Sequence, residues 1–563
     1  MGILKSFQAK YVGLILFVAL IIFFPGTDRP LQDPEAKYAE IPREMVVLGD
    51  WLTPHLDYAR FFDKPPLTFW ATALLYRTFG VSERVARLAN IFWAFAVAFL
   101  MGVLCEKLFG NGLGYLCSAL FLSTSGVCAY CLETGIEFGL ISFIVLAFIF
   151  FWDFYQKGSL LSLCLFYLSL GLAFMAKALV GVAVVGGTIF LFLLFNRDVK
   201  RLIKLFQPQA LAVFLILTVP WIMVMLKKHP DFFQVSFVNN HLHRFTGTMD
   251  SNNGLMPTPL FLALVAGEFF PWIIYLPQLG IALSKMVSRK IVPREKILFL
   301  LLWALVPLVM FSLSQSKGDY YGLNSYPPLI ILLSLPLKDL LGPKNFTSPR
   351  SWSYPWIIIS VLALASTLFL LLAKDQKLVY ALGIPSLRGA LVFFVAAFAL
   401  GLLVALSFMK GKVKLALFGI FLVMLIFFYS VPKAGFVASF PNESMKFAVD
   451  TFNKVAEQDA ILISDERPEF SHVSTLNFYT GRPVFLLRDN DGSLLHFIQK
   501  DIQAKCFDKT DLVRLCREGH TVYLVGKTEK TEERLSRLKL RSRILSSGGN
   551  RSLFRLEVSE NQH

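Results

Sequence analysis

Residues 59–70 read ARFFDKPPLTFW and place three charged side chains, Arg60, Asp63 and Lys64, beside a double proline and an apolar segment. A proline ring fixes φ at about −65°, so Pro65 and Pro66 favour a rigid corner that opens a helix. Charges next to apolar runs are costly unless they face water, a partner or a ligand. The stretch therefore indicates a functional corner at the surface of a membrane protein.

The composition agrees with that interpretation. The chain has 563 residues, of which 55% are hydrophobic, 17% are charged and 55 are phenylalanine. Apolar runs that can cross, or nearly cross, a hydrocarbon layer of about 30 Å recur between Tyr11 and Val431. We therefore expect a polytopic α-helical membrane protein with roughly 13 transmembrane helices.

Basic residues indicate the orientation of these spans. Lys and Arg cluster in alternate connections, at residues 5–10, 197–204, 285–296, 338–350 and 410–414. The positive-inside rule places these connections in the cytoplasm, so residues 26–86, 227–258, 315–327 and everything after about 433 face outward. The net charge of +16 is explained by contact with anionic membrane lipids, and no nucleic-acid motif accompanies it.

Outside the spans, the sequence predicts secondary structure in two segments, the first loop (26–86) and the tail (433–563). Residues 1–432 form the transmembrane domain, whose long first loop (26–86) should carry a short amphipathic helix at the membrane interface and a second surface or re-entrant helix after Pro66. Residues 433–563 should form a small α/β domain. The segments AILISDERP, RPVFLLRD and TVYLVGK suggest strands, ESMKFAVDTFNKVAEQ suggests a helix and SSGGNRS suggests a turn. A Cys506–Cys516 disulfide in this domain is left open.

Ionisable residues from distant loops gather at the predicted outer face. They are Asp33, Glu35, Arg60, Asp63, Lys64, Glu133, Lys177, His241, Arg244, Lys317 and Asp319. Lys177, inside an apolar run, needs a counter-charge from elsewhere in the fold or from a ligand. Other charges have simpler explanations: Arg43, Arg60, Lys227 and Lys228 can reach the lipid headgroups, and His241 and His243 can be ordinary loop histidines.

This mixture of groups fits an anionic lipid ligand. Arg and Lys hold phosphates, carboxylates act on hydroxyls or on a developing sugar cation, and aromatic rings such as Tyr320 and Tyr321 stack on a sugar. A proton-coupled transporter also collects charges, but it would bury them near the bilayer centre and show inverted repeats. The charges here lie at span ends, and the sequence shows no repeat.

Five segments of the chain resemble one known family. Residues 33–88 (DPEAKYAEIPREMVVLGDW through VSERVARL) resemble the first outer loop of bacterial membrane glycosyltransferases typified by the aminoarabinose lipid A transferase, which are relatives of protein O-mannosyltransferases. The likeness continues in order through MAKALVG, FVNNHLHRF, GEFFPWIIYLP and SLSQSKGDYYGLNSYPPL.

The resemblance implies a GT-C fold in the bacterial inner membrane, with a site that faces the periplasm. The implied reaction passes a sugar, 4-amino-4-deoxy-L-arabinose or a similar one, from undecaprenyl phosphate to lipid A or a related acceptor with inversion. The enzyme would be a monomer that needs no nucleotide sugar. The alternatives are a relative that glycosylates another lipid, a glycan or a protein hydroxyl, and a lipid or sugar transporter.

The resemblance also assigns roles to residues. Lys64 would bind the phosphate of the carrier or acceptor. Asp63 and His241 match a position that can hold a divalent metal (Zn²⁺, Mg²⁺ or Mn²⁺) in relatives. Arg244, Lys177 and Lys317 would complete the phosphate clamp, and Tyr321 would line the cavity. Arg60 and Tyr320 are added as substrate-binding candidates because of their place at the outer face and their residue types.

The catalytic carboxylates depart from the family pattern. The family reads P-D-E where this chain reads Asp33-Pro34-Glu35, so either Asp33 or Glu35 must take the role of the family aspartate. Glu133 replaces the second family aspartate, and Asp63 replaces a glutamate. These changes of side-chain length predict an altered acceptor or sugar rather than a loss of the chemistry.

Overall fold

The computed structural model describes residues 27–32, 35–110, 112–243, 246, 256–342, 347–373, 387–426, 444–457, 459–465, 473–487, 501 and 506–557. The chain divides into two compact units. The first unit holds residues 1–26, 90–220 and 254–438, and the second holds residues 27–89, 221–253 and 439–563. The division falls within α5 (Glu83–Phe109) and α12 (Pro208–Lys228). The predicted C-terminal domain thus shares a unit with the first loop.

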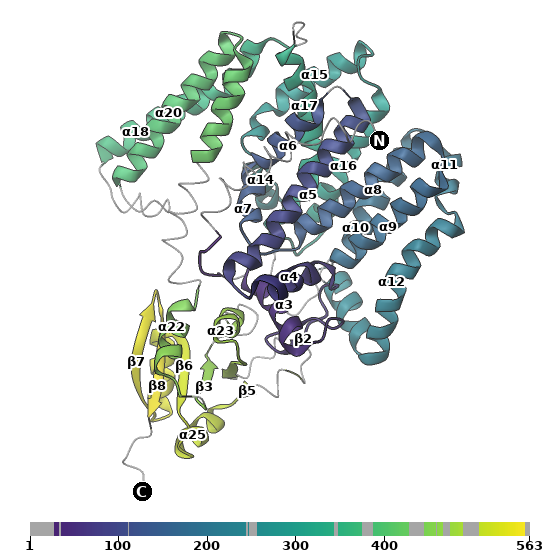
Figure 1. The fold of residues 1–563 in the computed structure, drawn as a ribbon. Coiled ribbons are helices and arrows are strands. Elements are labelled where there is room, and N and C mark those ends of the chain that lie inside the picture. Colours follow the sequence, from purple (N-terminus) through teal and green to yellow (C-terminus); the bar gives the residue numbers. More distant parts are fainter. Residues whose placement is uncertain are drawn as a thin grey trace. The chain divides into compact units, whose positions relative to one another are not determined.

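The first unit is helical. After α5 come α6 (Leu113–Leu122), α7 (Ser125–Cys131), α8 (Glu137–Lys157), α9 (Leu160–Lys177), α10 (Leu179–Phe195), α11 (Val199–Leu205), α12, α14 (Thr258–Glu268), η3 (Trp272–Tyr275), α15 (Leu276–Ser288), α16 (Arg294–Leu313), η4 (Asp319–Ser325), α17 (Tyr326–Leu341), η5 (Pro349–Trp352), α18 (Tyr354–Ala373) and α20 (Leu387–Met409). α8, α9 and α10 lie side by side, and α18 pairs with α20 (Figure 1).

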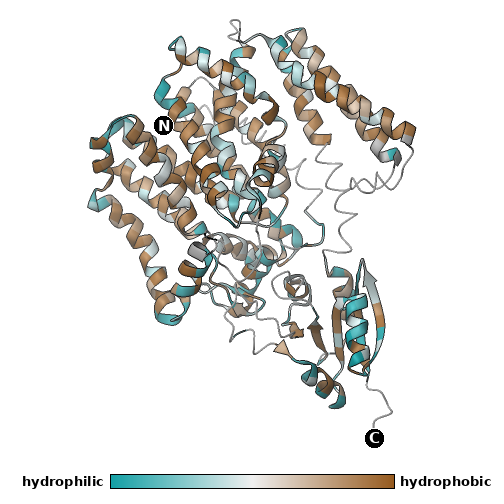
Figure 2. Cartoon of the chain, turned by 180° about the vertical axis from the view of Figure 1, so that it is seen from behind, coloured by the Kyte–Doolittle hydropathy of each residue, from teal (hydrophilic) through white to brown (hydrophobic). Residues whose placement is uncertain are grey.

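Membrane spans are recognised by length and composition. The described residues contain seven helices long and apolar enough to cross a membrane, or up to nine if two bent helix pairs each count as one span. Two shorter apolar helices, Leu179–Phe195 and Val413–Ile426, accompany them. The first predicted span, which begins at Tyr11, lies outside the described residues. Hydrophobic residues run along most of the length of these helices (Figure 2).

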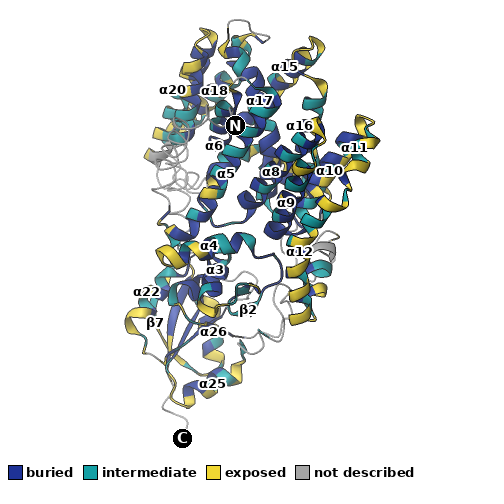
Figure 3. Ribbon diagram, turned by 45° about the vertical axis from the view of Figure 1, so that its right-hand side comes forward, coloured by how far each residue is buried: buried dark blue, intermediate teal, exposed yellow. Residues whose placement is uncertain are grey.

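Burial separates central helices from peripheral ones. In α8, 78% of the apolar window is buried, whereas the corresponding share in α18 is 28% (Figure 3). The rings of Phe148 and Trp303 lie 4.6 Å apart, and Trp152 is fully buried beside Phe299. Aromatic packing of this kind stabilises a helix pair beyond the area it buries. α8 is therefore a rigid central element, and the site described below lies at its first residue.

The second unit is a mixed α/β structure. It contains α3 (Ala36–Leu48), β1 (His55–Leu56), β2 (Ala59–Arg60), α4 (Leu67–Phe79), the π-helix η2 (Gln234–His243), α22 (Lys446–Val455), β3 (Ile461–Ser464), α23 (Val473–Thr480), β4 (Phe485–Leu487), β5 (Cys506–Phe507), α25 (Lys509–Arg517), β6 (Val522–Lys527), α26 (Thr528–Arg537), β7 (Arg541–Gly548) and β8 (Arg551–Glu557). Its six-stranded sheet has the order β5-β4-β3-β6-β8-β7. The β5, β4, β3 and β6 strands are parallel, and β8 and β7 add to β6 as an antiparallel pair.

The structure confirms the elements that the sequence predicts for the tail. The segments AILISDERP, RPVFLLRD and TVYLVGK supply β3, β4 and β6, and the predicted helix is α22. SSGGNRS contains the turn between β7 and β8, where Gly549 has a φ of +60°. No disulfide joins Cys506 and Cys516.

One expectation for the first loop is wrong. α3 has the predicted position, but it does not present a polar face to a membrane interface, because Glu40, Arg43 and Glu44 are buried in the same way as the alanines of the helix. Side chains from α4, from the start of α5 and from α23, among them Phe478, pack around α3. The predicted second helix is α4, which begins directly after Pro66.

Candidate active site

Lys177 is the last residue of α9 and is 4% exposed. The next residue, Ala178, adopts a φ of +48° between α9 and α10, so the chain turns sharply at the lysine. The Lys177 ammonium donates to Glu137 Oε1 at the start of α8. It also lies 4.5 Å from the centre of the Tyr321 ring and 5.4 Å from that of Tyr320. Both rings favour a cation over their faces. We call Lys177, Glu137, Tyr320 and Tyr321 together the lysine corner.

Tyrosines extend the lysine corner toward α7 and α14. The Tyr320 ring meets the Tyr130 ring edge to face at 6.1 Å. The Tyr130 hydroxyl donates to Glu268 Oε1 at 2.6 Å, and the Tyr326 hydroxyl donates to Glu268 Oε2 at 3.1 Å. Hydrogen bonds to both carboxylate oxygens hold Glu268 in one orientation. Glu268 thus fixes Tyr130, and Tyr130 in turn packs against the Tyr320 ring beside Lys177.

Two further predicted residues belong to the first unit. Lys317 is 5% exposed and donates to the backbone oxygen of Met256 at 2.9 Å. Glu133 is half-buried in the loop between α7 and α8. The Asn90 side chain donates to the backbone oxygens of Tyr130 and Glu133, at 2.8 Å in each case. Asn90 therefore fixes the short loop that carries Glu133.

Arg60 lies in the second unit and is engaged by carboxylates. Its guanidinium donates to both oxygens of Asp501, at 2.6 and 3.0 Å, and its backbone N–H adds a third bond. Burial raises the pKa of Asp501, but the bonds from Arg60 outweigh it and leave that pKa below its usual value. Arg60 also contacts His229 Nδ1 at 3.2 Å. Burial and the cationic Arg60 and Lys228 lower the pKa of His229, so its neutral form is favoured.

Asp63 and Lys64, the charged pair of the double-proline corner, bind each other. Lys64 Nζ lies 2.6 Å from Asp63 Oδ1, and both side chains are largely buried. The preceding Phe62 packs against His229 and Phe232, with ring centres 5.2 and 5.3 Å away. This packing and the helix start at Leu67 fix the corner that the prolines predict.

Glu35 is held by a buried arginine. Arg87, which is fully buried, donates to Glu35 Oε1 at 2.6 Å and to Oε2 at 3.3 Å. Arg87 also donates to the backbone oxygens of Thr27 and Arg29. This network favours a structural task for Glu35. Asp33, the alternative, lies outside the described residues, as do Arg244 and the side chain of His241.

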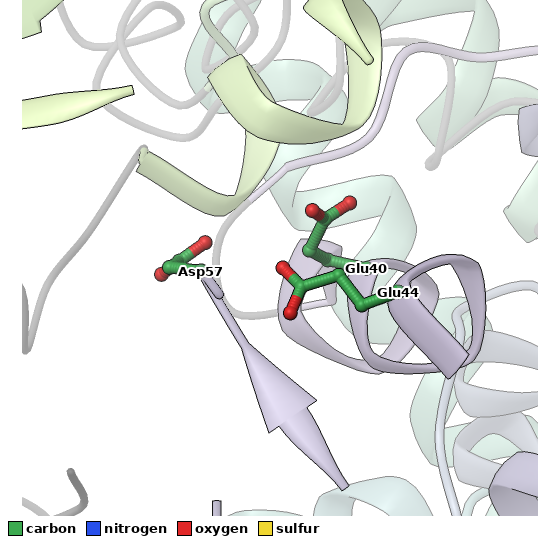
Figure 4. A group of neighbouring side chains, drawn as sticks. All are labelled: Glu40, Glu44 and Asp57. Atoms are coloured by element: carbon green, nitrogen blue, oxygen red, sulfur yellow. The ribbon is translucent and has the colours of Figure 1, made fainter. Parts of the chain in front are cut away.

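Three carboxylates converge between α3 and the β1–β2 hairpin (Figure 4). One oxygen from each of Glu40, Glu44 and Asp57 lies within 4.8 Å of the others. Arg43 neutralises Glu40 through two bonds of 2.6 and 2.7 Å, and Asp57 accepts from Ser474 and Asn477. Burial, followed by the charge of Glu40, raises the pKa of Glu44 well above its usual value. These contacts suit a carboxyl group that retains its proton.

Of the two predicted metal ligands, Asp63 and His241, only the side chain of Asp63 lies among the described residues. The Asp63 carboxylate, an oxygen donor suited to a divalent cation, already binds the ammonium of Lys64. A cation at Asp63 would therefore have to share this carboxylate with Lys64 or displace it. Metal binding by Asp63 and His241 stays a prediction.

Sequence reasoning missed the partners of the predicted residues. Glu137, Arg87 and Asp501 complete the ion pairs of Lys177, Glu35 and Arg60, and they lie 40, 52 and 441 residues away from them. The sequence could have marked Glu137 as a candidate, because it is an acidic residue at the start of a long apolar run. Nothing in the sequence marks Asp501, since it lies in an ordinary polar segment of the tail.

The fold defines the class of this protein. The chain superposes on the crystal structure of ArnT from Cupriavidus metallidurans bound to undecaprenyl phosphate with a TM-score of 0.79, at 23% identity and over 98% of both chains. The apo structure of the same protein gives a TM-score of 0.78. The chain therefore has the GT-C fold of a multi-pass membrane protein, and the predicted fold class is confirmed.

Sequence comparisons show which proteins of this fold the chain is similar to. The family described as dolichyl-phosphate-mannose-protein mannosyltransferase matches residues 63–224. Undecaprenyl phosphate-alpha-4-amino-4-deoxy-L-arabinose arabinosyl transferases from Serratia proteamaculans and Proteus mirabilis are 29% and 27% identical, over 60% and 79% of this chain. The matches span 61% and 81% of those relatives. The chain is thus similar to the aminoarabinose transferases, as its motifs predict.

Proposed function

We propose that this protein is a glycosyltransferase of the bacterial inner membrane. It transfers 4-amino-4-deoxy-L-arabinose, or a closely similar sugar, from undecaprenyl phosphate to lipid A or a related acceptor at the periplasmic face. The observation that carries the proposal is the similarity to the Proteus mirabilis transferase, which extends over 458 residues and 79% of this chain. The agreement in fold and the buried cation of the lysine corner support it.

The lysine corner supplies the groups that such a reaction needs in the first unit. The carrier leaves as a phosphate, so the transition state gains negative charge that cations stabilise. Lys177 and Lys317 are the proposed cations, and the Tyr320 and Tyr321 rings are the proposed platform for the sugar. Glu133, on the loop that Asn90 fixes, is the proposed group that acts on an acceptor hydroxyl.

Lys64 is the proposed phosphate ligand of the second unit. Its ammonium now binds Asp63, and an incoming phosphate would compete for it. Arg244 is proposed to assist, and a divalent metal at Asp63 and His241 would add a further positive charge. Asp33 is the proposed replacement for the family aspartate, because Arg87 already engages Glu35.

The acceptor determines how much a catalytic base matters. A phosphate acceptor is already an anion at neutral pH and needs orientation more than deprotonation, whereas a hydroxyl needs a base. Pro34 stands in the register of the family aspartate, so the choice depends on Asp33: with Asp33 in place as a base, both kinds of acceptor are open, and without a base at Asp33 or Glu35 a phosphate acceptor such as that of lipid A is favoured.

Transfer of a labelled sugar by the purified protein tests the proposal. Full-length protein in detergent is supplied with radiolabelled undecaprenyl-phosphate aminoarabinose and lipid A, and labelled lipid A is the expected product. A transporter only moves its substrate across a membrane, so it forms no labelled lipid A in detergent. Absence of transfer, together with transport of the labelled lipid by the same preparation in liposomes, would refute the enzyme and support a transporter.

A further inference from the structure

The ion pair between Lys177 and Glu137 has an unusual feature. Glu137 is 7% exposed, and its Oε1 accepts the Lys177 ammonium. Its second oxygen, Oε2, is buried and makes no hydrogen bond with the described part of the chain. A buried carboxylate oxygen that has lost its water without gaining a donor costs free energy.

Glu35, a carboxylate with a structural task, differs from Glu137 in its hydrogen bonds. Its Oε1 accepts from Arg87 and from the backbone N–H of Gln32, and its Oε2 accepts from Arg87 again. Both oxygens therefore accept hydrogen bonds, two at Oε1 and one at Oε2. Glu137 has one described donor, and that donor is the cation of the lysine corner. The contrast indicates that Glu137 contributes its charge to Lys177 rather than a hydrogen-bond network to the fold.

We propose that Glu137 is a resident counter-charge that adjusts the lysine corner to a singly charged phosphodiester and against a doubly charged phosphomonoester. The inference rests on the proposed function, because it needs the carrier phosphate to bind at Lys177. Glu137 is thus a specificity-determining residue that acts through Lys177. Its negative charge, held in a buried site, cancels much of the attraction that Lys177 alone would exert on an anion.

The substrate and product of the reaction differ in this charge. A sugar linked to polyprenyl phosphate is a phosphodiester with one negative charge. The released carrier is a monoester, whose second ionisation near pH 6 gives it a charge of about −1.5 to −2 at pH 7. A bare lysine would hold the product more tightly than the substrate, and turnover would be limited by product release. With Glu137 in place, that preference is weakened and the released carrier can leave.

Two lipid probes that differ in charge test the inference. The full-length protein in detergent is titrated with undecaprenyl phosphate and with its methyl diester, for the wild type and for Glu137→Gln. The wild type is expected to bind the two probes with similar affinity. Glu137→Gln is expected to bind the monoester about tenfold more tightly, with a change of at most about threefold for the diester. In the transfer assay, inhibition by undecaprenyl phosphate should increase in the same variant.

Two further variants separate charge from structure. Glu137→Asp keeps the charge and should retain the wild-type ratio of the two affinities. Asp153→Asn removes a carboxylate from the same helix, α8, where it binds Lys107 at 2.5 Å, and it should leave the ratio unchanged. If Glu137→Gln changes both affinities equally, or neither, the inference is wrong while the proposed function stands. If the wild type binds neither probe, the proposed function fails and the inference with it.

Discussion

At the scale of single residues, buried carboxylates in this chain have different tasks because their partners differ. Glu35 is bound to a fully buried arginine, Glu137 has one cationic partner, and Glu44 lies beside two other carboxylates. A buried charge survives only where it is paired and hydrogen-bonded, and otherwise the group takes up a proton. These environments lead to two separate predictions about stability.

Glu44→Gln should stabilise the protein above about pH 5. Because the pKa of Glu44 is raised in the folded state, the folded state binds more protons than the unfolded state above the usual carboxyl pKa of 4.5. Stability therefore falls as pH rises from 4.5 toward the raised pKa, by about 1.4 kcal/mol for every tenfold difference in proton affinity between the two states. Thermal unfolding from pH 4.5 to 8 should show this slope in the wild type and a weaker slope in Glu44→Gln.

A divalent metal at the same carboxylates predicts the opposite result. Added Zn²⁺, Mg²⁺ or Mn²⁺ would then raise the melting temperature of the wild type but not that of Glu44→Gln. Glu44→Asp keeps a titratable group and should keep the pH slope. A metal-dependent rise in the wild type would contradict the protonated carboxyl.

Glu35→Gln and Asp33→Asn should differ in which property they change. Loss of the Glu35 charge leaves Arg87 buried without its counter-ion, which costs about 3 kcal/mol, so the melting temperature should fall. Asp33→Asn should lower transfer activity at an unchanged melting temperature. Unfolding and labelled-sugar transfer measured on both variants check this. Full activity in both would show that neither carboxylate replaces the family aspartate.

At the scale of elements, short irregular segments hold the charged residues in place. The β1–β2 hairpin turns through Asp57 and Tyr58, with φ values of +54° and +59°, and this turn sets the direction of Arg60 on β2. The Asp57 carboxylate binds Ser474 and Asn477 of α23. The hairpin is thus fastened to the tail, and Arg60 is fastened to Asp501.

A comparison of Arg60→Ala with Asp501→Asn should separate the two tasks that Arg60 could have. If Arg60 only joins β2 to the tail, both variants lose about 1 kcal/mol of stability and carrier binding is unchanged. If Arg60 also binds the carrier phosphate, Arg60→Ala weakens binding of undecaprenyl phosphate whereas Asp501→Asn strengthens it. We expect the second result, because a phosphate could take the place of the partly exposed Asp501. Equal loss of binding in both variants would contradict it.

At the scale of the whole molecule, the sequence predicted what local patterns determine. The apolar helices in the described part of the chain, the Pro65–Pro66 corner and the strands of the tail were confirmed, because each depends on neighbouring residues. The pairing of Glu137 with Lys177 and of Asp501 with Arg60 could not be predicted, since these residues meet only through the tertiary fold. The exposed polar face predicted for α3 was wrong for the same reason. Its charges are buried because Arg43 pairs with Glu40, and because α23, more than 400 residues away, packs on it.

The contact between the first loop and the tail gives a final prediction. Phe478 of α23 packs with Ala36, Ala39 and Tyr76, and the Tyr479 hydroxyl accepts the backbone N–H of Leu31. Phe478→Ala should cost about 3 kcal/mol and speed hydrogen exchange in α3. Phe507→Ala removes a ring from the sheet core, where Phe507 packs on Phe485 at 4.7 Å, and serves as the matched control.

Phe478→Ala and Phe507→Ala should differ in their effect on hydrogen exchange in α3. Phe507→Ala should destabilise the sheet but leave exchange in α3 near the wild-type rate, since its ring contacts the strand beside it. If the tail braces the loop, Phe478→Ala alone should also lower sugar transfer, because α3 directly follows Glu35 and precedes the double-proline corner. Unchanged exchange in α3 for Phe478→Ala would mean that the loop folds independently of the tail, and that the C-terminal residues serve another purpose.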